Sequence, residues 1–151
     1  MLLYVMRHGD AVQFARTDAE RPLSDWGREQ ASKMVPHLTQ CLPTRIIASP
    51  YLRAQQTARI VCDGLKVESF ETVTGITPES DPFLALRQLQ AFENEVLLMV
   101  SHQPLVSSLI GLLVDGHLAG GYMMGTASIA HLSLDMVGPG HARLEWLRHA
   151  S

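Results

Sequence analysis

Two arginines and two histidines in this sequence have the chemistry of a phosphate-binding pocket. They are Arg7, His8, Arg53 and His102. Guanidinium groups donate paired hydrogen bonds to phosphoryl oxygens, and a neutral imidazole has a lone pair that can attack phosphorus. Gly9 would also allow the backbone to approach an anion closely. These residues therefore predict a site for phosphoryl transfer.

Different roles are predicted for the two histidines. His8 is the expected nucleophile, because neighbouring positive charge should lower its pKa and leave its lone pair free. His102 is expected to donate to the phosphoryl oxygens, together with Arg7 and Arg53, in a loose transition state. Histidine pairs also bind zinc, but the two arginines would repel the ion. We therefore expect neither a metal nor another cofactor.

The segments that must position these residues read as short buried strands. Each is a brief apolar run that ends just before a loop with candidate site residues: Leu2–Met6 before Arg7 and His8, Arg45–Ala48 before Ser49–Arg53, and Glu95–Val100 before Ser101 and His102. Strands that alternate with helices predict a mostly parallel sheet with helices on both faces. Ligands of such sheets bind beyond the carboxyl ends of the strands, so we expect the three loops to form one pocket.

The remaining pattern completes an α/β domain. A helix is predicted after Ser49, with Ser49 as the N-cap and Pro50 at the first helical position. The other expected elements are helices at Trp26–Thr39, Phe83–Phe92 and Leu105–Val114, a strand at Lys66–Phe70, and a hairpin of Ala127–Leu134 with Ala142–Leu147.

Composition limits the partners and the compartment. The 151 residues, 46% of them hydrophobic, suit one core, so we expect a single domain over residues 1–151. The formal charge is −3 and the basic residues are scattered, which argues against nucleic acid or a membrane surface as a partner. Met1–Met6 is too short for a signal-peptide core, and Cys41 and Cys62 suit a reducing compartment. We expect a cytoplasmic monomer.

Three motifs in order resemble the histidine phosphatase, or phosphoglycerate mutase-like, superfamily. They are Arg7-His8-Gly9 after a strand, Ser49–Ala58 as an S-P-x-x-R-A-x-Q-T helix start, and Val100-Ser101-His102 at a strand end. The resemblance spans nearly the whole chain. It implies a three-layer α/β/α sandwich, a phosphohistidine intermediate on His8, and a phosphate pocket that also contains His102, Arg7 and Arg53.

The short length, with Met6–Ala11 and Arg21–Ser24, is most similar to the SixA-type phosphohistidine phosphatases within that superfamily. This resemblance implies a phosphohistidine on a His-containing phosphotransfer protein of a phosphorelay as the substrate, and phosphate as a product. Arg21 would bind phosphate at the rim of the pocket or form a surface salt bridge.

A glutamate general acid of the larger relatives has no evident counterpart here. Glu79, Asp81, Asp10 and Asp18 are candidates by type, but each also suits a solvated loop or a helix cap. A phosphate ester expels an alkoxide and needs a proton donor, whereas phosphohistidine expels an imidazole whose conjugate acid has a pKa of about 6.5. The missing acid therefore favours a phosphohistidine substrate.

Two alternatives stay open. The same mechanism could serve small phosphate esters, in which case one loop carboxylate must matter for turnover. Alternatively, the chain could be a module that binds phosphoproteins without hydrolysing them. The intact His8 argues against the module, because a degenerate member would be expected to lose the histidine or an arginine first.

Overall fold

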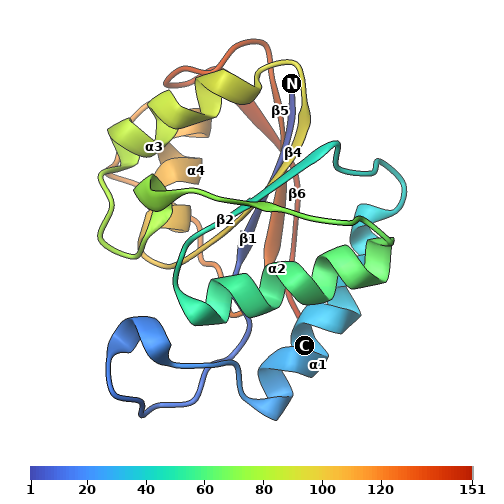
Figure 1. The fold of residues 1–151 in the computed structure, drawn as a ribbon. Coiled ribbons are helices and arrows are strands. Elements are labelled where there is room, and N and C mark those ends of the chain that lie inside the picture. The colour runs from blue at the N-terminus through green and yellow to red at the C-terminus, as the bar shows by residue number, and fades with distance from the viewer. Residues whose placement is uncertain (151) are drawn as a thin grey trace.

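A computed structural model describes residues 1–150, and its centre is one six-stranded sheet (Figure 1). The strands are β1 (Leu2–Arg7), β2 (Arg45–Ala48), β3 (Glu71–Thr72), β4 (Val96–Ser101), β5 (Ile129–Leu134) and β6 (Ala142–Arg148). Their order is β3-β2-β4-β1-β5-β6. The pairs among β3, β2, β4 and β1 are parallel, while β5 is antiparallel to both β1 and β6. The predicted mostly parallel sheet and the C-terminal hairpin are confirmed.

Helices cover both faces of the sheet, which confirms the three-layer α/β/α architecture (Figure 1). They are α1 (Asp25–Met34), α2 (Leu52–Leu65), α3 (Pro82–Leu89) and α4 (Leu105–Asp115), with short 3-10 turns at Asp18–Glu20, Val35–Leu38, Thr74–Ile76 and Gln90–Phe92. One hydrophobic core lies between the sheet and α1 with α2. The other lies between the sheet and α3 with α4.

The alternation of side chains along β1 shows why this apolar run forms a strand. Leu3 and Val5 belong to the core under α3 and α4, while Tyr4 and Met6 belong to the core under α1 and α2. All four side chains are buried, as expected for a strand with both faces covered. Burial of this kind is the main stabilising contribution to the fold. It fixes the end of β1, and with it Arg7.

The predicted start of the helix after Ser49 was wrong. The helix begins at Leu52, Tyr51 is its N-cap, and no side chain caps it. The Oγ of Ser49 instead accepts a hydrogen bond from the backbone N–H of Tyr51 at 3.2 Å and contacts His102. Ser49 and Pro50 thus form the turn that leads from β2 into α2.

Two other boundaries differ from the prediction. The prediction of a strand at Lys66–Phe70 was wrong. Lys66 adopts a left-handed conformation (φ 59°) that ends α2, and the strand that pairs with β2 is Glu71–Thr72. Val67 and Phe70 pack against the core under α2 instead of alternating across a sheet. The helix expected at Trp26–Thr39 changes at Val35 into a 3-10 turn that contains Pro36.

No helix within residues 1–150 combines the length and the apolar character needed to cross a membrane. Cys41 and Cys62 are both free thiols, and Cys62 is fully buried in the core as a small hydrophobic side chain.

Candidate active site

The two histidines lie together because their strands are parallel neighbours. In the pairing of β1 with β4, Arg7 is opposite Ser101, so His8 and His102 leave the sheet side by side. The backbone N–H of His8 donates to the carbonyl oxygen of Ser101 at 3.0 Å. The two imidazole rings are 5.0 Å apart between centroids, with an interplanar angle of 57°. Both side chains are buried, with 6% and 1% exposure.

Arg53 reaches the same point from the first turn of α2. Its Nε lies 3.2 Å from Nε2 of His8, and the side chain is 4% exposed. The ring of Tyr51 lies beside both Arg53 and His102, with its centroid 5.1 Å from the Arg53 guanidinium carbon and 5.0 Å from the centroid of the His102 ring. The α2 start therefore brings a fixed positive charge onto the predicted nucleophile.

Arg7 completes the group of four predicted residues. Its Nη1 donates to the carbonyl oxygen of Met124 at 3.0 Å, which ties the end of β1 to the loop before β5. The charge of Arg7 is close enough to lower the pKa of His8. The four side chains that the sequence singled out thus surround one point at the carboxyl ends of β1 and β4.

The hydrogen bonds of His8 determine which of its nitrogens is free. Its Nδ1 lies 2.7 Å from the carbonyl oxygen of Gly9. A carbonyl oxygen only accepts hydrogen bonds, so Nδ1 must carry the proton. Nε2 is then unprotonated, and it receives the N–H of Arg53. The lone pair of His8 is therefore on Nε2, where in this structure it accepts the hydrogen bond from Arg53.

Ser49 is a site residue that the sequence analysis missed. Its Oγ lies 2.7 Å from Nε2 of His102, and Ser49 is completely buried. Within residues 1–150, the Ser49 hydroxyl has no acceptor other than this nitrogen, so it donates to Nε2 and leaves the His102 proton on Nδ1. The signal was present in the motif that begins at Ser49, but the same residue type is also typical of a helix cap.

Two buried polar atoms beside His8 have no hydrogen-bond partner in the part of the chain that the structure describes. They are Nδ1 of His102 and Nε of Arg7. A buried donor without a partner costs about 1–3 kcal/mol. Both atoms are donors here, so a bound anion beside His8 would satisfy them. The arrangement fits a tetrahedral oxyanion seated against Nε2 of His8.

Burial is the main reason why both imidazoles stay neutral. Burial is the largest of the causes that lower the pKa of His8 from 6.5 to about 4; the charges of three arginines act in the same direction, and the hydrogen bond to Gly9 opposes them. Burial, with smaller effects of His8 and Arg53, lowers the pKa of His102 to about 2. The predicted direction is confirmed for His8. The predicted cause was incomplete, because loss of hydration outweighs the neighbouring charges.

Arg21 lies at the rim and is linked to the centre by Asp18. Nε of Arg21 donates to Oδ1 of Asp18 at 2.8 Å, and Nη1 donates to the carbonyl oxygen of Val12 at 3.0 Å. The other carboxylate oxygen of Asp18 accepts from Nη2 of Arg53 at 3.2 Å. Both alternatives for Arg21 are therefore compatible with its position: it forms a salt bridge, and its charge acts on His8.

The four candidate acids have other partners or face solvent. Asp10 accepts a hydrogen bond from Ser24 at 2.6 Å, Asp81 caps α3, and Glu79 is exposed. Asp18 is next to the arginines, but their hydrogen bonds and charges lower its pKa although partial burial opposes this. Asp18 is therefore ionised at neutral pH and unsuited to donate a proton.

Backbone packing holds the loop after β1 in place. A Cβ atom on Gly9 would lie 2.5 Å from the carbonyl oxygen of Gly27, and a Cβ on Gly27 would lie 1.9 Å from the carbonyl oxygen of Asp10. The backbone N–H of Gly9 donates to Oγ1 of Thr57 in α2 at 3.1 Å. The loop that carries His8 is thus clamped between α1 and α2, and glycine is required on both sides.

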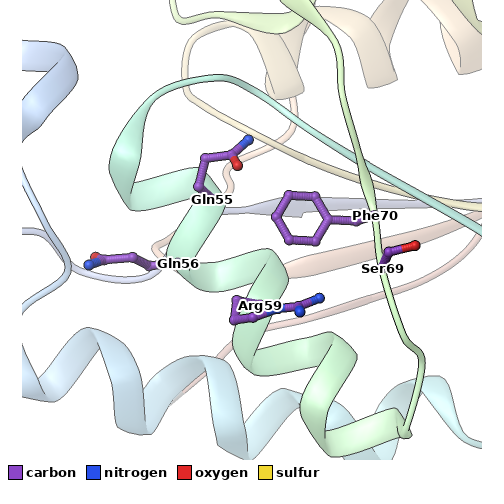
Figure 2. A pocket seen from close by; sticks show the side chains of 5 residues that line it. All are labelled: Gln55, Gln56, Arg59, Ser69 and Phe70. Atoms are coloured by element: carbon purple, nitrogen blue, oxygen red, sulfur yellow. The ribbon is translucent and has the colours of Figure 1, made fainter.

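A second hollow, beside the outer side of α2, is separate from this group (Figure 2). It is lined by Gln55, Gln56, Arg59, Ser69 and Phe70. Figure 2 shows Gln55 and Arg59 on the side of α2 that faces Ser69 and Phe70. Gln55 donates to the carbonyl oxygen of Ser49 and to Thr72, so it braces the turn behind the site without entering it.

Residues 1–150 contain no group of three or more His, Cys, Asp or Glu side chains arranged to bind a metal ion. The positive charges of Arg7 and Arg53 beside His8 are suited to an anion instead.

Comparison with known proteins identifies relatives of this arrangement. The family model described as the histidine phosphatase superfamily (branch 1) matches residues 3–76. The chain is 37% identical over 146 residues to the phosphohistidine phosphatase SixA of Escherichia coli K12, covering 93% of this chain and 89% of that protein. It is 35% identical over 123 residues to the SixA homolog of Haemophilus influenzae, covering 73% and 75%.

The similarity extends to solved structures. The structure of the protein histidine phosphatase SixA complexed with tungstate superimposes with a TM-score of 0.90 and 34% identity, covering 99% of this chain and 97% of that one.

Proposed function

Since this chain belongs to the histidine phosphatase superfamily and is a phosphatase, we propose that it removes phosphate from a phosphohistidine of a phosphorelay protein, through a covalent intermediate on His8. The observation that carries this proposal is the unprotonated Nε2 of His8, which accepts a hydrogen bond from Arg53, in a group where His102 and Arg7 each have a buried nitrogen without a partner within residues 1–150.

In the first step, the lone pair of His8 Nε2 attacks the phosphorus of the substrate. A bond forms between Nε2 and phosphorus while the phosphorus–nitrogen bond of the substrate breaks. The electron pair of that bond stays on the substrate nitrogen, and the substrate ring, protonated on its other nitrogen, leaves as neutral imidazole. The proton stays on Nδ1 of His8, which donates to the carbonyl oxygen of Gly9 at 2.7 Å, and this oxygen stabilises the positive charge that develops on the ring.

In the second step, a water oxygen attacks the same phosphorus. The bond between phosphorus and Nε2 breaks, and its electron pair returns to Nε2. The water protons pass to phosphate and solvent, so the products are inorganic phosphate and the free enzyme. The low pKa of His8 supports this step, because a weakly basic nitrogen is a good leaving group at neutral pH.

The surrounding donors have a separate task. The charge on the transferring group is spread over its three equatorial oxygens, and fixed donors stabilise it most where water is excluded. Nδ1 of His102 and Nε of Arg7 are unpaired within residues 1–150 and available for those oxygens. Arg53 adds a positive charge beside Nε2 of His8, although its own donors are engaged by His8 and Asp18 in this structure. Tungstate, which is bound to the related SixA structure, is a tetrahedral oxyanion like phosphate and supports this assignment.

The substrate class follows from the leaving group. Asp18, the candidate acid that contacts Arg53, is ionised and paired with Arg53 and Arg21, so it is unsuited to protonate an alkoxide. An imidazole leaves without such help, since its conjugate acid has a pKa of about 6.5. The names of the E. coli and H. influenzae relatives agree with a phosphohistidine substrate.

The proposal includes the setting of the reaction. We infer a single-domain monomer that acts in the cytoplasm on a His-containing phosphotransfer protein, without metal, cofactor, nucleic acid or membrane. The two free thiols and the positive pocket in an otherwise acidic chain support this inference.

Phosphate release in the presence of EDTA tests the function. The substrates are a phosphohistidine-bearing phosphotransfer domain and an aryl phosphate, each with wild type, His8→Ala and the exposed-site control His141→Ala. We expect fast release from the protein substrate by wild type and the control only. Turnover of the aryl phosphate alone would refute the substrate class, and binding without any turnover would favour a phosphoprotein-binding module.

The intermediate is tested by stopping the reaction early. Mass spectrometry of wild type should find acid-labile phosphate on the peptide that contains His8. Rapid turnover without such a phosphopeptide would contradict the two-step mechanism.

A further inference from the structure

The outer donors of Arg53 are already occupied in this structure. Its Nη1 donates to the backbone carbonyl oxygen of Asp18 at 2.8 Å, and its Nη2 donates to the Asp18 carboxylate at 3.2 Å. Its Nε faces His8. The buried guanidinium therefore connects the nucleophile on one side with a carboxylate on the other.

The carboxylate of Asp18 lies between two arginines but remains in contact with solvent. Arg53 is 4% exposed, whereas the Asp18 side chain is 57% exposed. Asp18 also binds Arg21, whose Nε is 2.8 Å from Oδ1. A single loop carboxylate thus engages both the central arginine and the arginine at the rim, and it can move toward solvent when another anion arrives.

Phosphate and this carboxylate require the same cation. An anion seated against Nε2 of His8 must contact Arg53, since the Arg53 Nε is 3.2 Å from that nitrogen. The negative charge of Asp18 is then on the opposite edge of the same guanidinium. Two negative charges that share one guanidinium repel each other, and solvent reduces this repulsion because the Asp18 side chain is 57% exposed.

From this arrangement, and resting on the proposed function of the pocket, we propose that Asp18 is an internal competitor of phosphate. Its carboxylate holds Arg53 and Arg21 when the pocket is empty and weakens the binding of the product phosphate. Asp18 thereby promotes product release. It is a positioning residue for Arg53 and takes part in no bond-making step.

The test removes the charge of Asp18 and keeps its shape. Asp18→Asn retains a side-chain acceptor and leaves the backbone carbonyl that binds Arg53 unchanged. The matched control is Glu20→Gln in the same 3-10 turn, because Glu20 pairs with Arg16 on the surface and not with the pocket arginines. Inorganic phosphate is titrated into each protein by calorimetry, and turnover of the phosphohistidine protein is measured in the same preparations.

We expect Asp18→Asn to bind phosphate about 10-fold more tightly than wild type, while Glu20→Gln binds it as wild type does. Steady-state turnover by Asp18→Asn should also become more sensitive to added phosphate. A purely structural role would instead weaken phosphate binding, because Arg53 would lose its support.

Equal or weaker phosphate binding by Asp18→Asn, or no binding by either protein, overturns the inference. If wild type hydrolyses the phosphohistidine protein in that case, the proposed function stands. If Asp18→Asn binds phosphate more tightly but wild type does not hydrolyse the phosphohistidine protein, the proposed function is refuted. The inference that Asp18 competes with phosphate is then supported.

Discussion

The Oγ of Ser49 lies 2.7 Å from Nε2 of His102, and both residues are buried at the end of the sheet. The contact joins the loop after β2 to the loop after β4, two strands that pair in parallel. Because Ser49 donates to Nε2, it keeps the His102 proton on Nδ1, the atom that has no protein partner within residues 1–150. Ser49 therefore sets the tautomer that a phosphoryl oxygen would meet.

Replacing Ser49 by alanine tests this relationship. Ser49→Ala should lower kcat about 10-fold, because His102 can then present the wrong tautomer to the transition state at a cost of roughly 1.4 kcal/mol. Ser101→Ala is the matched control, since Ser101 is equally buried and its Oγ binds the carbonyl oxygen of Ile76 at 2.7 Å. We expect the two variants to lose similar amounts of stability, and Ser49→Ala to lose more kcat than Ser101→Ala. Equal kcat values for the two variants would contradict the role of Ser49.

Arg53 should not be replaceable by lysine. Arg53→Lys keeps a positive charge but loses the fork that contacts His8 and Asp18 at the same time. Loss of a fixed donor to the transferring group typically lowers kcat about 100-fold or more. Stopped-flow phosphate release measures the effect. Arg59→Lys, on the outer side of the same helix (Figure 2), is the control and should retain the wild-type rate. If Arg59→Lys lost as much kcat as Arg53→Lys, the cause would be a loss of helix stability.

Stability should fall as pH is lowered toward 4. Burial lowers the pKa of His8 from 6.5 to about 4 in the folded chain, so between these values the unfolded chain binds more protons. The contribution is fully present above pH 6.5, and about 3 kcal/mol of it is lost by pH 4. Urea denaturation at several pH values should show a smaller loss for His8→Asn than for wild type. His141→Asn, at an exposed site, should follow wild type; parallel curves for all three proteins would refute the prediction.

Much of the fold was predictable because each signal was local. The apolar run of β1 and the run of β4 predict buried strands whatever surrounds them, and the residues that follow a strand must lie at its end. The neighbourhood of His8 and His102 needed one further assumption, that their strands share a sheet. The sheet order shows that β1 and β4 are direct neighbours.

The parts that were missed depend on contacts between distant residues. Ser49 precedes a helix, and its residue type suits a cap as well as a partner for His102, 53 positions later. The contact of Asp18 with Arg53 spans 35 positions and depends on the path of an irregular loop. Burial, the main cause of the low pKa of His8, is likewise a property of the packed chain.

Chelation should leave the activity unchanged. The positive charges of Arg53 and Arg7 act on His8, and a divalent cation would be repelled from the same space. Prolonged dialysis against EDTA, followed by a phosphate-release assay, is expected to give the rate of the untreated protein. A loss of activity that added zinc or magnesium restores would contradict the proposed mechanism.

The final prediction concerns the clamp behind His8. In Gly27→Ala, the new Cβ would meet the carbonyl oxygen of Asp10 at 1.9 Å, a backbone contact that no side-chain rotation relieves. The loop after β1 would have to move away from α1, and His8 with it. We expect a loss of about 3 kcal/mol in the free energy of unfolding and a larger relative loss of kcat than stability alone explains.

Gly111→Ala separates this clash from a general effect of the substitution. Gly111 is also buried in a helix, but a Cβ there would have its nearest neighbour at an ordinary 3.5 Å. Because alanine favours helix over glycine by up to about 1 kcal/mol, this variant should keep or gain stability and retain its activity. If Gly27→Ala were as stable and as active as Gly111→Ala, the close approach of α1 could not be what holds His8 against Arg53.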